Sequence, residues 1–215
     1  MLKRFSNPPT LIIAGAWNPD ILSPSWIAKE AMGLELNQDF PVNVQFPIGN
    51  PTQRPTFEFE KIKFNAARGQ LTFFLANDDL EQVNKSISTA AKILELLSHT
   101  PITGFGFNFA HEIEDTSVPL RKTFSSSDLS MFLEEADVQT VVQKWGSSIK
   151  TQQYLLSVNA ELEGNKTTLE FNAHFEVTSA TGASQLLKDA TLYPSAEQIT
   201  SSIAQKLHDL GEGTL

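Results

Sequence analysis

The 215-residue chain is 40% hydrophobic and 19% charged, which suits one large domain or two small, closely packed ones. Its net charge of −9 disfavours binding to nucleic acid phosphates, and the absence of cysteine excludes disulfides, thiolate nucleophiles and cysteine-based metal sites. We find no signal-like N-terminus and no apolar run of roughly 20 residues that would cross a bilayer, so we expect a soluble, cytoplasmic protein.

The first half of the chain gives strand and helix signals that end in a long helix. A short helix opens at Ser23-Pro24 and stops at Gly33. Around it the pattern predicts strands at Leu11–Trp17, Val42–Ile48, Phe57–Asn65 and Gln70–Ala76. Within the third strand a bulge near Glu60-Lys61 would restore the alternation of apolar side chains. The long helix is predicted at Leu80–Leu97, with Asn77, Asp78 and Asp79 as capping candidates.

The second half repeats this order. A strand at Ile102–Ile113 leads to a short helix at about Asp128–Glu135. Strands are then predicted at Val138–Trp145, Gln152–Glu163 and Thr167–Val177, with a hairpin turn in "EGNKT" (163–167). The final helix is predicted at Ala196–Leu210, capped by Ser195, with Ile199, Ile203, Leu207 and Leu210 as its apolar stripe.

The two long helices are also similar in sequence. The segment "EQVNKSIS" (81–88) aligns with "EQITSSIA" (197–204), and each half reads β-α-β-β-β-α. We therefore predict a single α+β domain over 1–215, built from pseudo-repeats at about 10–99 and 100–215, with a mostly antiparallel, one-sided sheet and helices on one face. In element order alone this resembles the repeated half of the TATA-binding protein saddle, and the resemblance implies no function.

The segment "GFGFNF" (104–109) is similar to the aromatic strand of an RNA-recognition module but lacks its basic residue and its final aromatic residue. Alternation places Phe105, Phe107 and Phe109 on one face, and burying one Phe is worth about 1.5–3 kcal/mol. We therefore predict that the three rings point into the core. The opposite face, with Gly104 and Gly106, would then allow a neighbour to approach closely.

No pattern in the sequence forms a catalytic, cofactor or metal constellation. Gly104 and Gly106 begin a dinucleotide fingerprint, but Phe109 stands where its third glycine belongs. Ser147 and Lys150 match S-x-x-K without its companion motifs. The sequence therefore indicates no metal and no cofactor, leaves enzymatic activity uncertain, and favours a non-enzymatic interaction or structural protein.

The charge is concentrated in the second half of the chain. Residues 1–100 hold 9 basic and 10 acidic side chains, a net −1, whereas residues 101–215 hold 7 and 15, a net −8. Alternation collects polar groups on the wet face of the predicted sheet. This face is either simply solvated or a docking face for a basic partner, and the candidate docking residues are Asn108, Glu112, Glu114, Glu161, Glu163, Glu170, Asn172, His174 and Glu176.

Two alternatives stay open. One is a small-molecule binder or enzyme with an apolar pocket between helices and sheet, for which the candidate lining residues are Trp26, His111, Trp145 and Tyr154. The other is a homo-oligomer formed through a sheet edge or the glycine-lined strand. Neither nucleic acid nor a membrane is expected as a partner.

Overall fold

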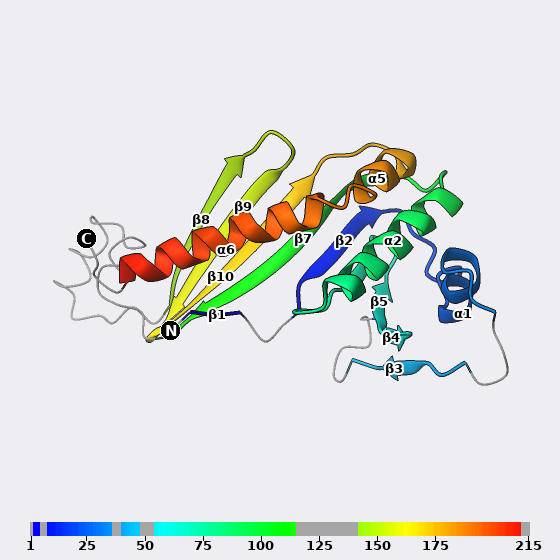
Figure 1. Cartoon of the computed structure of the whole chain (residues 1–215), viewed down its shortest axis with the longest axis horizontal. Helices are drawn as coiled ribbons and strands as arrows, with labels where there is room; N and C mark the ends of the chain where they lie inside the picture. Colours follow the sequence, from blue (N-terminus) through cyan, green and yellow to red (C-terminus); the bar gives the residue numbers. More distant parts are fainter. Residues whose placement is uncertain (1, 5–7, 36–39, 48–53, 115–141, 212–215) are drawn as a thin grey trace. The chain divides into compact units, whose positions relative to one another are not determined.

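The computed structural model describes residues 2–4, 8–35, 40–47, 54–114 and 142–211 (Figure 1). The chain divides into two compact units. Unit 1 comprises Met1–Asn7, Phe109–Ala173 and Ser195–Leu215, and unit 2 comprises Pro8–Asn108 and His174–Pro194. The predicted pseudo-repeats at 10–99 and 100–215 remain a prediction.

Unit 2 contains most of the strands of the first half of the chain. Its strand order is β3-β4-β5-β6-β2-β7, and the five pairs between neighbouring strands are hydrogen-bonded. The bounds are β2 (Thr10–Gly15), β3 (Asn43–Gln45), β4 (Thr56–Phe59), β5 (Ile62–Ala66), β6 (Gln70–Phe74) and β7 (Ile102–Ile113). One face of these strands is buried. Its buried side chains are those of Leu11, Ile13, Ile62, Phe64, Leu71, Phe73, Phe105 and Phe107. This face forms the core of unit 2.

The helices of unit 2 begin where side chains cap them. Ser23 caps the short α1 (Pro24–Trp26), which continues as the π-helix η1 (Ile27–Ala31), and Gly33 follows with a φ of 68°. Asp79 accepts a hydrogen bond from the Gln82 amide at the start of α2 (Leu80–Leu96). These features confirm the predicted starts of both helices.

A further helix, α5 (Ala180–Leu187), is capped by Ser179 and was not predicted from the sequence. It lies beside α2 (Figure 1). The helix is only two turns long, so its apolar pattern is too short to identify without its packing partner. It buries Ala180, Ala183 and Leu187.

Unit 1 contains the strand order β7-β10-β9-β8, with β1 (Leu2–Arg4) also paired to β7. The bounds are β8 (Val142–Lys150), β9 (Leu155–Glu163) and β10 (Lys166–Phe175), and α6 (Leu192–Gly211) contributes its residues from Ser195 onward. The predicted hairpin between β9 and β10 is confirmed, with Gly164 at a φ of 57°. The predicted helix at about Asp128–Glu135 and the first part of the strand predicted at Val138–Trp145 lie outside the described residues.

The segment "FEFEKIKF" forms a hairpin and not one bulged strand. β4 pairs antiparallel with β5, so that Phe59 lies opposite Ile62 and the chain reverses at Glu60 and Lys61. Both turn residues have positive φ, 47° and 63°, as a two-residue hairpin turn requires. The apolar parity changes across this turn because the chain reverses direction there.

α6 starts earlier than predicted and buries another face. The helix begins at Leu192, so Ser195 lies within it rather than at its cap, and Pro194 occupies the first turn, where a missing N–H is tolerated. The fully buried positions are Ala196, Thr200 and Ala204, whereas Ile199 is 39% exposed. Small side chains four residues apart allow a helix backbone to approach its neighbour closely.

The predicted orientation of "GFGFNF" is confirmed. Phe105, Phe107 and Phe109 are each no more than 3% exposed. On the other face, a Cβ added to Gly104 would lie 2.6 Å from Cε1 of His174 on β10. The neighbour that approaches this glycine is therefore a side chain of the adjacent strand.

The fold is α+β with an antiparallel, one-sided sheet, as predicted. Among the described residues, no helix combines the length and apolar character needed to cross a membrane.

Candidate functional site

The predicted acidic face divides between the two units. Asn108, His174 and Glu176 belong to unit 2. There the Asn108 amide donates to the Thr10 hydroxyl over 3.1 Å, and the His174 ring lies against Gly104. The members in unit 1 are Glu112, Glu114, Glu161, Glu163, Glu170 and Asn172.

Unit 1 brings part of the predicted face together on the open side of β8, β9 and β10. Glu161, Glu163 and Glu170 are exposed, whereas Leu162, Leu169 and other residues at alternating positions are buried. This alternation follows from the two-residue period of a strand with one wet face. Sequence alone therefore located these three carboxylates correctly on a solvent-facing surface.

Two lysines, which the sequence analysis did not include, also lie on this surface. Lys144 on β8 pairs with Glu161 at 3.0 Å, and Lys166 on β10 pairs with Glu112 at 2.7 Å. Lys144 is directly opposite Glu161 in the β8–β9 register, so the strand pairing itself creates the contact. The lysines neutralise two of the carboxylates.

A hollow of about 480 Å³ lies on this surface. Its lining carries three carboxylates and two ammonium groups, a net charge of −1. Neither Glu163 nor Glu170 forms an ion pair with another residue in the described part of the chain. The lining residues are Lys144, Trp145, Gly146, Asn159, Ala160, Glu161, Glu163, Lys166, Thr168 and Glu170. We call this surface the acidic hollow.

The four candidate pocket residues do not lie in one unit. Trp26 is half-buried in unit 2, and the other three belong to unit 1. His111 is buried with its ring edge-on to Phe171 at 5.7 Å, and Trp145 is 39% exposed and lines the acidic hollow. Tyr154 is 7% exposed, and this burial raises the pKa of its hydroxyl.

Unit 2 contains an apolar pocket that the sequence analysis missed. Its volume is about 430 Å³, and it lies among α2, α5 and the turn that leads into α6. Phe107, whose ring is edge-on to Tyr193 at 5.4 Å, contributes to the wall. The other apolar lining residues are Ile87, Ala91, Leu187, Ala190 and Leu192. We call this the helix pocket.

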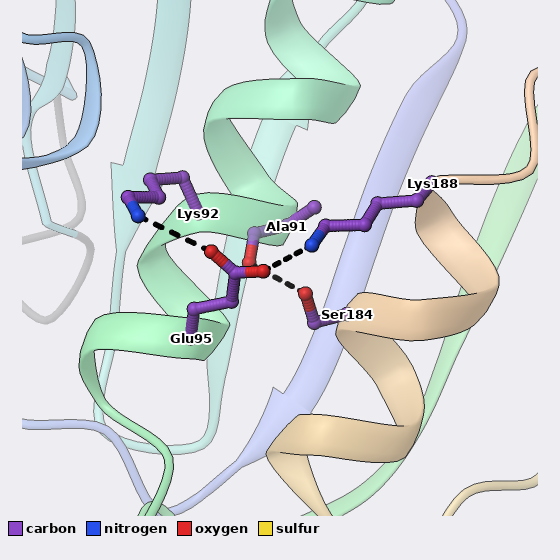
Figure 2. A network of polar contacts seen from close by, with 5 residues as sticks. All are labelled: Ala91, Lys92, Glu95, Ser184 and Lys188. Carbon is purple, nitrogen blue, oxygen red and sulfur yellow. Dashed lines mark hydrogen bonds and ion pairs between the residues drawn. The ribbon is translucent and has the colours of Figure 1, made fainter.

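The polar side chains at the helix pocket include an ion-pair network (Figure 2). The Glu95 carboxylate on α2 contacts the ammonium groups of Lys188 and of Lys92, the latter at 3.3 Å. These two lysines, Lys188 first, lower the pKa of Glu95 from its ordinary value of 4.5. Because α5 was not predicted, the approach of Lys188 to Glu95 was not predicted either.

The remaining carboxylate at this pocket is already engaged. Asp189 accepts hydrogen bonds from the hydroxyl of Thr191 at 2.7 Å and from its amide at 2.9 Å. These two bonds, the hydroxyl first, lower the pKa of Asp189. Both carboxylates of the pocket lining, those of Glu95 and Asp189, are therefore engaged by side chains of unit 2.

The described residues contain no group of three or more His, Asp or Glu side chains that could hold a metal ion. No family model matches the chain, and comparisons with curated proteins and with solved structures gave no match.

Proposed function

We propose that this chain is a non-enzymatic interaction protein that docks a basic partner segment on the acidic hollow of unit 1. The observation that carries the proposal is that the hollow is lined by two exposed carboxylates, Glu163 and Glu170, that form no ion pair with another described residue. Lysine or arginine side chains of a partner would supply the opposite charge.

The expected interaction is weak and depends on salt. An exposed ion pair contributes about 0.2–1 kcal/mol, so two or three pairs do not alone produce a tight complex. Such pairs steer association and are screened when the ionic strength rises. The partner should therefore bind transiently, with an affinity that falls between about 50 mM and about 500 mM NaCl.

The test is charge reversal at Glu163 and Glu170, the two carboxylates of the hollow that form no ion pair with a described lysine. In E163K/E170K, we expect the affinity for a fluorescent decalysine peptide, measured by anisotropy, to fall about tenfold. The matched control is E30K/E81K in unit 2, which changes the net charge by the same amount at two exposed positions. An equal loss of affinity in the control would show that net charge alone attracts the peptide, and the proposal would fail.

A second candidate function, small-molecule binding in the helix pocket, rests on a separate observation. The pocket volume of about 430 Å³ lies within the range of about 300–1,000 Å³ that ligand sites occupy, and much of the lining is apolar. A thermal-shift screen of amphiphilic compounds tests it. Compounds that bind this pocket should lose their effect in A190W, because Ala190 lines the pocket with an exposed side chain.

A further inference from the structure

The helix pocket combines an apolar interior with cations at its opening. Phe107, Leu192 and Tyr193 are each buried to at least 96%, so the lining is formed by residues that the fold itself holds in place. By contrast, the side chains of Lys92 and Lys188 are 48% and 58% exposed. A ligand that fits both parts needs an apolar body and an anionic end.

The pairing of Lys188 with Glu95 depends on a buried contact between helices, whereas Lys92 lies on α2 itself, three residues before Glu95. The Ser184 hydroxyl of α5 donates to the Ala91 carbonyl of α2 over 2.9 Å, and both residues are buried (Figure 2). Lys188 lies one turn after Ser184, at the C-cap of α5, and Glu95 lies one turn after Ala91 on α2. The helix contact therefore brings the lysine to the carboxylate, and side-chain flexibility alone does not explain the pair.

Glu95 occupies the place that a ligand anion would take. Its carboxylate is the shared partner of both ammonium groups, and its side chain is 34% exposed. A ligand carboxylate could replace it one for one, because Glu95 can then return to water and the number of charges between the lysines does not change. Asp189 does not compete for the lysines through the oxygen that Thr191 already binds.

We infer that the helix pocket binds an amphiphilic carboxylate, whose apolar chain lies along the lining that includes Ile87 and Ala190 and whose carboxylate replaces that of Glu95 between Lys92 and Lys188. The inference rests on the second candidate function and names its ligand class. Each methylene that enters the pocket should raise affinity roughly fourfold, so that decanoate binds more tightly than octanoate.

The experiment measures binding of decanoate and of the neutral decanol to the full chain by calorimetry. In K92M/K188M, which keeps most of the apolar length of both side chains, we expect decanoate to bind roughly three- to thirtyfold more weakly, while decanol stays within about twofold. In E95Q, decanoate should bind more tightly, because the amide holds the lysines less strongly. The control K29M/K150M removes two other exposed lysines and should leave both affinities unchanged.

The two ligands separate failure of the inference from failure of the pocket. If decanol and decanoate bind equally and K92M/K188M changes neither, the pocket stands and the anion inference is overturned. If neither ligand binds the wild-type chain, the result contradicts both the second candidate function and the inference about its ligand class. Equal weakening of decanoate in K29M/K150M also overturns the inference, because the lysines would then act only through net charge. Retained decanol binding in K92M/K188M shows that the variant is folded.

Discussion

The acidic hollow of unit 1 and the helix pocket of unit 2 carry similar charged residues but differ in their charge balance and in how far their lining is buried. In the hollow, three carboxylates outnumber two lysines, and the side chains stand on an open sheet face. In the helix pocket, two carboxylates balance two lysines, and the carboxylate of Glu95 is shared by both lysines above a lining that belongs to the core. The first surface can therefore change without affecting the fold, whereas the lining of the second is part of what stabilises unit 2.

The largest effect is expected at the wall of the helix pocket. Phe107→Ala should lower the free energy of unfolding by about 3–5 kcal/mol, because the buried ring also packs against Phe105, Phe175 and Tyr193. Urea denaturation checks this value, and Phe107→Leu should cost less because it leaves a smaller cavity. A loss below about 1 kcal/mol for the alanine variant would mean that the pocket lining does not support the core.

A smaller effect is expected at the contact between α2 and α5. Ser184→Ala removes the hydroxyl that donates to the Ala91 carbonyl and should cost about 0.5–1.5 kcal/mol. Ser202→Ala, at an exposed position of α6, is the matched control and should stay within about 0.5 kcal/mol of the wild-type chain. If the two variants unfold at the same urea concentration, the hydrogen bond from Ser184 does not stabilise the packing of α5 against α2.

The carboxylate shared by the two lysines should give a small, pH-dependent contribution to stability. Because Lys188 and Lys92 lower the pKa of Glu95 in the folded chain, its ionised form favours folding. This stabilisation is present above the ordinary value of 4.5 and is lost as the pH falls through the lower folded value. Glu95→Gln should therefore flatten the pH dependence of the urea midpoint as the pH falls below 4.5. An unchanged slope would contradict the shared ion pair.

The smallest effect is expected in the acidic hollow. Glu163→Gln and Glu170→Gln should each change the free energy of unfolding by no more than about 0.5 kcal/mol, since both side chains are exposed. Thermal unfolding of both variants beside the wild-type chain measures this. A loss above about 1 kcal/mol would show that these carboxylates contribute to folding, and the contrast between the two regions would disappear.

The two hairpins show why one turn was predicted and the other was not. Between β9 and β10, Gly164 identifies a turn that needs positive φ. Between β4 and β5, Glu60 and Lys61 adopt positive φ although neither residue favours it. Side chains of α2 bind this turn, since Lys85 donates to the Glu60 carbonyl at 3.1 Å and Gln82 to that of Lys61 at 2.6 Å. Contacts distant in sequence therefore support a turn that its own residues do not indicate.

The candidate sites likewise contain some residues that local sequence patterns predict and others that they do not. Strand alternation placed Glu161, Glu163 and Glu170 on a wet face, because side chains on a strand alternate with a period of two whatever lies nearby. The ion pairs of Lys144 with Glu161 and of Lys166 with Glu112 could not be predicted, because both depend on which strands pair and in which register. The helix pocket was missed altogether, because α5 is too short to be recognised without α2.

The sequence by itself determined the α+β class, the long helix α2 and the inward-facing phenylalanines of β7. These features follow from local periodicity and from the large gain in burying an aromatic ring. Only the tertiary structure decided that Lys188 reaches Glu95, that His174 covers Gly104 and that α6 buries Ala196, Thr200 and Ala204 in place of Ile199. Each of these depends on how closely two distant segments approach, and a local pattern of polar and apolar residues does not encode that distance.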